Sequence, residues 1–231
     1  RANKFFLSSC KKIFCYSENI KNFPEKFINK IIRIDPLVNK NIYESLNSNL
    51  EKKKFNILIV GGSQSAKIFD ESLKNLLIEI SKKIPIKIFH QTSKTNISHL
   101  QNFYYENNVE NVIFNFDKNF TKTIAQADLC ITRAGASTLA ELSILNIPFI
   151  AVPLPTAKDN HQLLNAQFYD ALDCCWLIEQ KFFKEKIGEV LRDILENKDK
   201  YTKKKENLKK LNYQNTWIRA NQKILKILNE N

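Results

Sequence analysis

Three of the four glycines in this 231-residue chain fall in two short segments that also carry hydroxyl side chains. The first segment, Gly61, Gly62, Ser63 and Gln64, follows an apolar run and precedes an amphipathic stretch. Glycine lets a backbone approach a ligand closely, and the N–H groups that begin a helix can hold a phosphate. The segment therefore predicts phosphate binding, although a tight turn whose serine caps the next helix fits the pattern as well.

The second segment begins at Arg133 and again places small residues between an apolar run and a helix start, where an anion is favoured. Thr138 and Glu141 have the S/T-x-x-E spacing of a capping box, in which the carboxylate satisfies a backbone N–H. The same carboxylate could instead accept two hydrogen bonds from the diol of a ribose, and the pattern leaves both open. The candidate binding residues here are Arg133, Gly135, Ala136, Ser137, Thr138, Leu139, Ala140 and Glu141.

A third polar segment follows the apolar run that ends at Val152. If this segment is helical, His161, Gln162 and Asn165 share one face. An imidazole and two amides suit the hydroxyl groups of a sugar. A helix start with solvated polar side chains would explain the same residues.

These segments punctuate an alternation of short apolar runs and longer amphipathic stretches, which predicts a parallel sheet with helices on both faces. We expect an α/β fold, a Rossmann-like doubly wound sheet, with ligands at the carboxyl ends of its strands. The expected strands are 55–60, 86–90, 111–116, 128–132, 148–152 and 174–178. The expected helices are 66–81, 97–107, 121–127, 137–145 and 160–172, and the charged end of the chain, 184–228, is expected to form further helices.

The first part of the chain has a different pattern. We expect a helix over 3–12 and strands over 13–16 and 30–34, as the end of a preceding domain that occupies 1–40. The polar stretch 41–54 is typical of an interdomain linker, and 55–231 is expected to form the main domain. The chain starts at Arg1 and has no methionine, so we expect it to be a fragment of a longer protein.

The net charge, the cysteines and the lengths of the apolar runs limit the classes of protein that this chain can belong to. The net charge of +12 favours anionic partners, but signatures of nucleic-acid-binding modules are absent. Five cysteines without paired spacing argue against a disulfide framework and favour a reducing cytoplasm. No apolar run reaches the roughly 20 residues of a membrane-spanning helix.

Four sequence stretches resemble the C-terminal half of the MurG family, the glycosyltransferases that add N-acetylglucosamine during peptidoglycan synthesis. They are ILIVGGSQSAKIFDESL, HQTSK, ADLCITRAGASTLAEL and IPFIAVPLPTAKDNHQLLNA. The resemblance implies the donor-binding domain of a two-domain GT-B enzyme. Ser65 and Val38 stand where the family has a glycine and an arginine.

The resemblance also implies roles for single residues. It places Ser63 against the donor diphosphate and Glu141 on the ribose hydroxyls. The remaining implied contacts are Phe116 and Asp117 with the uracil, the run from Ala136 with the nucleotide, His161, Gln162 and Asn165 with the N-acetylglucosamine, and Asn3 near the domain junction.

The implied reaction transfers N-acetylglucosamine from UDP-N-acetylglucosamine to the undecaprenyl-pyrophosphoryl-muramyl-pentapeptide acceptor, converting lipid I to lipid II. The expected location is the cytoplasmic face of the bacterial inner membrane, as a peripheral protein, with no metal, no cofactor and no nucleic-acid partner. The general base is expected outside these residues, so the 231 residues alone should bind the donor weakly and without turnover. Two alternatives stay open: another UDP-sugar enzyme, such as an epimerase, and a basic nucleic-acid-binding module.

Overall fold

The computed structural model describes residues 5–16, 20, 23–44, 53–62, 67–213 and 216–229. Of the predicted site residues, Asn3, Ser63 and Gln64 lie outside these ranges. The chain divides into two compact units, one of Val38–Asn212 and one that combines Arg1–Leu37 with Tyr213–Asn231. The sequence division placed 213–231 in the main domain, whereas these units group it with the first 37 residues.

The larger unit is built around a six-stranded parallel sheet with the strand order β5-β4-β3-β6-β7-β8. Counted from β3, this is the 3-2-1-4-5-6 order of doubly wound folds, so the predicted fold class is confirmed. The strands are β3 Phe55–Val60, β4 Ile86–Gln91, β5 Glu110–Phe114, β6 Leu129–Thr132, β7 Phe149–Ala151 and β8 Cys175–Leu177.

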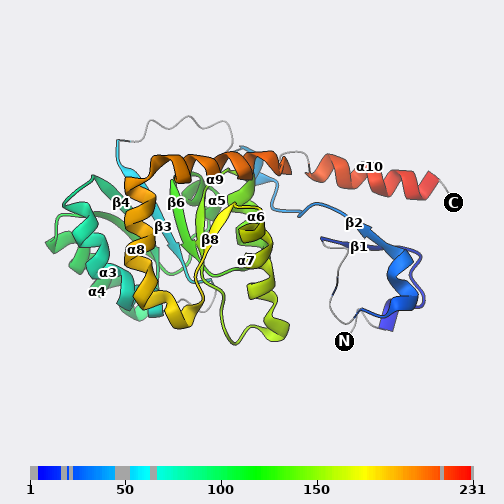
Figure 1. Ribbon diagram of the computed structural model, residues 1–231, viewed down its shortest axis with the longest axis horizontal. Helices are drawn as coiled ribbons and strands as arrows, with labels where there is room; N and C mark the ends of the chain where they lie inside the picture. The colour runs from blue at the N-terminus through cyan, green and yellow to red at the C-terminus, as the bar shows by residue number, and fades with distance from the viewer. Residues whose placement is uncertain are drawn as a thin grey trace. The chain divides into compact units, whose positions relative to one another are not determined.

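Helices cover both faces of this sheet, which explains why its central strands are mostly apolar. Figure 1 shows α3, α4 and α8 on one side and α6 and α7 on the other. The helices are α2 Asn41–Glu44, α3 Lys67–Ser81, α4 Ile97–Glu106, α5 Phe120–Ala125, α6 Ala136–Ile144, α7 His161–Ala171, α8 Phe183–Glu196 and α9 Lys198–Lys210, with short 3-10 helices η3 Lys94–Asn96, η4 Lys158–Asn160 and η5 Gln180–Phe182.

The spacing of apolar residues in α3 shows how the sequence produces one of these layers. Phe69, Leu73 and Leu77 are fully buried and lie four residues apart, on one face of the helix. That face packs with Ile57 of β3 and Phe183 of α8 in the main core. Burying side chains of this size contributes roughly 1.5–3 kcal/mol each, enough to fix the helix on the sheet.

Asparagine and aspartate end several helices in this glycine-poor chain. Asn108, Asn146 and Asp173 adopt positive φ angles of 57°, 53° and 52° just after α4, α6 and α7. In each case the N–H of the following residue closes the turn, as Val109 does by donating to the carbonyl of Tyr104. These two residue types tolerate the left-handed conformation better than others, so they take the place that glycine usually fills.

The smaller unit contains a parallel pair of short strands, β1 Ile13–Cys15 and β2 Ile31–Arg33, with η1 Glu25–Lys30 between them. Its C-terminal helix α10 Thr216–Asn229 is tied to the strand end: Arg219 Nε lies 2.8 Å from Asp35 Oδ2, and Lys223 Nζ donates to the carbonyl of Arg33. These contacts hold α10 against this short two-stranded sheet.

One prediction for the first 54 residues is wrong. The helix expected over 3–12 does not extend through its second half, because residues 7–9 form a turn and 10–12 are not helical. Lys30 Nζ lies 3.0, 3.1 and 2.7 Å from the carbonyl oxygens of Leu7, Ser8 and Cys10, and this capped turn replaces the helix. The range 41–54, predicted as a linker, begins with α2, whose Ile42 is fully buried, and its role as a linker stays a prediction.

Candidate functional site

The two glycine-containing loops begin side by side at the carboxyl edge of the sheet. β3 and β6 are parallel neighbours in which Val60 is paired with Thr132, and Arg133 N donates to the carbonyl of Val60 over 3.2 Å. These are the strands between which the strand order reverses, the usual ligand position in doubly wound folds. The sheet therefore brings the segment after β3 next to the segment that opens α6.

The N-terminus of α6 is open as far as the described residues show. Gly135 precedes the helix, no described side chain caps it, and a Cβ added at Gly135 would meet no described atom within 4 Å. Ala136 and Ser137, in its first turn, are exposed. Because the first N–H groups of a helix have no partner within it, this end of α6 offers donors and a positive potential to an anion.

The Glu141 carboxylate is partly buried and has no charged or hydrogen-bonding partner among the described residues. Burial raises the pKa of Glu141 above its ordinary value, and nothing nearby lowers it. The capping-box interpretation is wrong, because the helix starts at Ala136 and Thr138 lies inside it. Glu141 therefore keeps its full capacity to accept hydrogen bonds, which is what diol binding requires.

The face of α7 carries the three polar residues that the sequence singled out. Gln162 Oε1 accepts a hydrogen bond from Leu154 N over 3.0 Å, and Asn165 Nδ2 donates to the carbonyl of Ala134 over 3.0 Å. Each amide thereby holds a loop that follows a strand. Gln162 Nε2 and Asn165 Oδ1 have no protein partner among the described residues. His161 is exposed, with Nδ1 2.7 Å from the carbonyl of Lys158. These contacts place α7 beside the loop that opens α6.

Arg133 is held by protein groups. Its guanidinium donates to the carbonyl of Val152 over 3.2 Å and to Gln180 Oε1 over 2.6 Å. The guanidinium carbon also lies 5.2 Å from the centre of the Phe69 ring, a cation–π geometry. Arg133 thus braces the start of the α6 loop against the neighbouring strands, and its predicted contact with a ligand stays a prediction.

The loop after β5 contains Phe116 and Asp117. The strand ends at Phe114, two residues earlier than predicted, and Phe116 is 76% exposed. Asp117 Oδ1 accepts a hydrogen bond from Asn119 N, and its Oδ2 accepts one from Thr123 Oγ1. The side chain therefore shapes the turn into α5, which leaves main-chain groups of this loop to meet a ligand.

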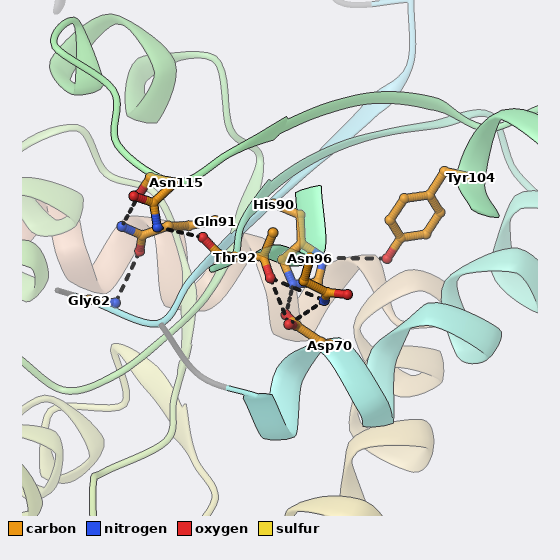
Figure 2. A network of polar contacts seen from close by, with 8 residues as sticks. All are labelled: Gly62, Asp70, His90, Gln91, Thr92, Asn96, Tyr104 and Asn115. Carbon is orange, nitrogen blue, oxygen red and sulfur yellow. Dashed lines mark hydrogen bonds and ion pairs between the residues drawn. The ribbon is translucent and has the colours of Figure 1, made fainter. Parts of the chain in front are cut away.

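A buried polar network connects α3 to the end of β4, and the sequence analysis assigned it no function (Figure 2). Asp70 of α3 accepts from His90 Nε2 over 3.0 Å, from Thr92 Oγ1 over 2.7 Å and from Asn96 Nδ2 over 2.7 Å. Burial alone would raise the pKa of Asp70, but the hydrogen bonds, with that from His90 foremost, lower it. Tyr104 OH lies 3.4 Å from His90 Nδ1 and completes the network.

The network could have been suspected from one signal. His90, Gln91 and Thr92 end an apolar strand with three consecutive polar residues, at the edge where this fold places ligands. His90 and Thr92 are nevertheless fully buried, so they contact α3 and not solvent. Only Gln91, between them, is turned toward the glycine loop, where its Oε1 accepts from Gly62 N over 3.1 Å.

Two further findings concern the described part of the chain. No three histidine, cysteine, aspartate or glutamate side chains there gather into a group that could hold a metal ion. No helix there is long and apolar enough to cross a membrane. The predictions about metal independence and membrane location stay predictions.

A family model decides the relationship. The glycosyltransferase family 28 C-terminal domain matches residues 56–216. The chain belongs to this family. The matched range begins at the second residue of β3 and ends at the first residue of α10, so it includes the six-stranded sheet except for Phe55.

Two sequence relatives carry the same name, UDP-N-acetylglucosamine–N-acetylmuramyl-(pentapeptide) pyrophosphoryl-undecaprenol N-acetylglucosamine transferase. The protein of Pelagibacter ubique (strain HTCC1062) is 50% identical over 232 residues, which cover 100% of this chain and 65% of that protein. The protein of Rickettsia canadensis (strain McKiel) is 36% identical, over 85% of this chain and 57% of that protein. The chain thus spans less than two thirds of the length of these relatives.

Solved structures agree with the family assignment. The crystal structure of Acinetobacter baumannii MurG superposes with a TM-score of 0.70 at 25% identity, covering 96% of this chain and 64% of that one. A glycosyltransferase from Rickettsia africae ESF-5 gives a TM-score of 0.60 at 15% identity, over 99% of this chain and 67% of that one, and shows the fold alone. The predicted resemblance to the C-terminal half of the MurG family, with its GT-B fold, is confirmed, and donor binding by this domain stays a prediction.

Proposed function

We propose that the chain is the donor-binding domain of an N-acetylglucosaminyltransferase of peptidoglycan synthesis. The substrates of the whole protein would be UDP-N-acetylglucosamine and the undecaprenyl-pyrophosphoryl-muramyl-pentapeptide acceptor. Family membership and the names of the two relatives support this proposal. The observation that carries it is the unpartnered Glu141 carboxylate beside the open N-terminus of α6.

Each part of the donor has a matching group at the sheet edge. The loop that begins at Gly61 and the start of α6 would surround the diphosphate, where N–H groups stabilise negative charge. Glu141 would accept hydrogen bonds from the ribose diol, and main-chain groups of the Phe116–Asp117 loop would meet the uracil. The free amide halves of Gln162 and Asn165 would face the sugar.

The proposed reaction is a direct displacement with inversion at the anomeric carbon. The bond from that carbon to the diphosphate oxygen breaks, a bond to a muramyl hydroxyl forms, and the hydroxyl proton passes to a general base. UDP leaves with additional negative charge, which the N-terminus of α6 would stabilise. We propose that this stabilisation does the work that a metal ion does in other transferases, so that chelator treatment leaves donor binding unchanged.

The proposed acceptor is a lipid, so a peripheral position on the cytoplasmic face of the inner membrane follows from it. The smaller unit supports such contact with a set of exposed apolar side chains, which comprises Phe5, Phe6, Phe14, Tyr16, Ile20 and Ile28. The net charge of +12 would add attraction to anionic headgroups. Sedimentation with anionic vesicles, and its loss when exposed phenylalanines are replaced by serine, would test this position.

Calorimetric titration of the 231-residue chain with UDP-N-acetylglucosamine tests the donor assignment. UDP-glucose, ADP-ribose and a short DNA duplex serve as controls for the two alternative functions. We expect selective binding of UDP-N-acetylglucosamine, weakened about ten- to a hundredfold in Glu141→Gln, because a hydrogen bond to a charged acceptor contributes about 1.5–3 kcal/mol.

The matched control is Glu106→Gln, an exposed carboxylate at the end of α4. That substitution should leave binding unchanged. Equal binding of UDP-glucose would favour another UDP-sugar enzyme. Salt-sensitive binding of DNA without binding of the UDP-sugar would overturn the proposal in favour of a basic nucleic-acid-binding module.

A further inference from the structure

Gln91 joins two loops that belong to different strands (Figure 2). Its side-chain oxygen Oε1 accepts from Gly62 N over 3.1 Å, and its Nε2 donates to the carbonyl of Asn115 over 3.2 Å. β4 lies between β3 and β5 in the sheet, so one side chain at its end can reach both neighbouring loops. A single amide therefore connects the loop after β3 to the loop after β5.

The orientation of this amide is fixed by its partners. Gly62 presents an N–H and Asn115 presents a carbonyl oxygen, so only one placement of the Gln91 oxygen and nitrogen makes both hydrogen bonds. If the amide were rotated by half a turn, its NH₂ group would face the N–H of Gly62 and its oxygen would face the carbonyl oxygen of Asn115, so neither hydrogen bond could form. The bridge therefore has one stable arrangement.

Buried neighbours hold both ends of the bridge. Asn115 Nδ2 donates to the carbonyl of Thr92 over 2.9 Å, and Thr92 N donates to the carbonyl of Phe114 over 2.8 Å. The Thr92 hydroxyl is in turn bound by Asp70 of α3. Since Thr92 is fully buried, the bridge rests on a part of the core that water does not reach.

The bridge also decides what Gly62 can do. Its N–H is already taken by Gln91, and its φ of +77° is a conformation that residues with a side chain adopt at a cost. Gly62 therefore contributes to ligand binding through the shape of the loop and not by donating its own N–H.

We propose that Gln91 is a positioning residue that fixes the distance between the diphosphate-binding loop and the uracil-binding loop. This inference rests on the proposed function, because the occupants of the two loops are the two ends of UDP. Loss of the bridge would leave each loop able to meet its own half of the ligand but would misplace one half relative to the other. Gln91 variants should thus lose affinity for UDP more than for uridine, which would contact only one of the two bridged loops.

Glycine labelling gives a readout that needs no ligand. The chain has four glycines, so ¹⁵N-glycine labelling yields four backbone amide signals. In Gln91→Met, which keeps the side-chain length but has no amide, we expect the Gly62 N–H to exchange with solvent at least about tenfold faster. Gly188, inside α8, is the internal reference and should not change.

Two further variants separate positioning from general damage. Gln91→Glu retains an oxygen for Gly62 N but cannot donate to Asn115, so it should restore slow exchange of the Gly62 amide without restoring UDP affinity. Gln101→Met replaces an exposed glutamine of α4 and should change nothing. In the titrations we expect Gln91→Met to bind UDP about tenfold more weakly than wild type and uridine within about twofold.

The outcomes distinguish this inference from the proposed function. Unchanged Gly62 exchange in Gln91→Met, or equal losses of UDP and uridine affinity, would overturn the positioning role. If wild type binds no UDP-sugar, the proposed function fails, and the role of the bridge in ligand binding fails with it. Fast Gly62 exchange in Gln91→Met would then show only that the bridge shapes the loop.

Discussion

Two carboxylates next to the candidate site have opposite surroundings. Asp70 in α3 is held by His90, Thr92 and Asn96, and these hydrogen bonds lower its pKa. Glu141 in α6 has no such partner among the described residues, and burial raises its pKa. A carboxylate whose oxygens already accept hydrogen bonds from the protein stabilises the fold. A buried carboxylate without such donors costs stability until a ligand donates to it. The comparison assigns stability to Asp70 and ligand binding to Glu141.

The largest change in the free energy of unfolding should come from removing the hydrogen-bonded carboxylate of Asp70. Asp70→Ala should lower the free energy of unfolding by about 3 kcal/mol, because three buried donors lose their acceptor. Urea denaturation measures it. Glu71→Ala, next in sequence, removes only two exposed ion pairs, 3.7 Å to Lys67 and 3.6 Å to Lys184, and should cost less than about 1 kcal/mol.

Glu141→Ala completes this comparison in the same assay. Removing an unpartnered carboxylate should leave the free energy of unfolding within about 0.5 kcal/mol of wild type. A loss in Glu141→Ala as large as that in Asp70→Ala would mean that the two carboxylates do not differ as the structure indicates.

The pH dependence should differ in sign between the two residues. Because the pKa of Asp70 is lower in the folded state, it contributes stability above its ordinary pKa of 3.8, and this stability is lost as pH falls through the folded-state pKa. Glu141 has a raised pKa, so its protonation favours the folded state, and that contribution is lost as pH rises through the folded-state pKa.

Donor binding should report the Glu141 titration directly. A protonated carboxyl loses acceptor capacity, so affinity for UDP-N-acetylglucosamine should begin to fall at a pH above the ordinary Glu value of 4.5, by up to about tenfold per pH unit. Calorimetry between about pH 7 and about pH 5 would measure it. The curve should be flat in Glu141→Gln; the same slope in that variant would assign the titration to another group.

The smallest effects should come from the two loop glycines. Gly62 has a φ of +77°, so Gly62→Ala should cost about 1 kcal/mol of stability, whereas Gly135, with a φ of −70°, should accept alanine within about 0.5 kcal/mol. Both positions have open space for a Cβ, so neither variant meets a clash. Thermal unfolding of the pair tests this, and equal stabilities would contradict the left-handed strain at Gly62.

Much of the fold could be predicted because its signal is local. The strand Phe55–Val60 and the helix Lys67–Ser81 have the predicted type and bounds to within one residue, since apolar periodicity reports which faces are buried. The N-terminal helix prediction failed at the point where Lys30, distant in sequence, binds three carbonyl oxygens. A contact between residues so far apart in the sequence does not change the apolar periodicity of the segment, so the sequence pattern could not predict it.

By itself, the sequence determined the alternation of strands and helices, hence the parallel sheet, and the two glycine-containing loops at the edge where ligands bind. Only the tertiary structure showed which roles the side chains around these loops have. It showed that Glu141 has no partner among the described residues, that Arg133 braces a loop, and that Gln91 bridges Gly62 to Asn115. These roles depend on which strand ends lie adjacent in the sheet, and hydrogen bonds between them form only once the strand order is set.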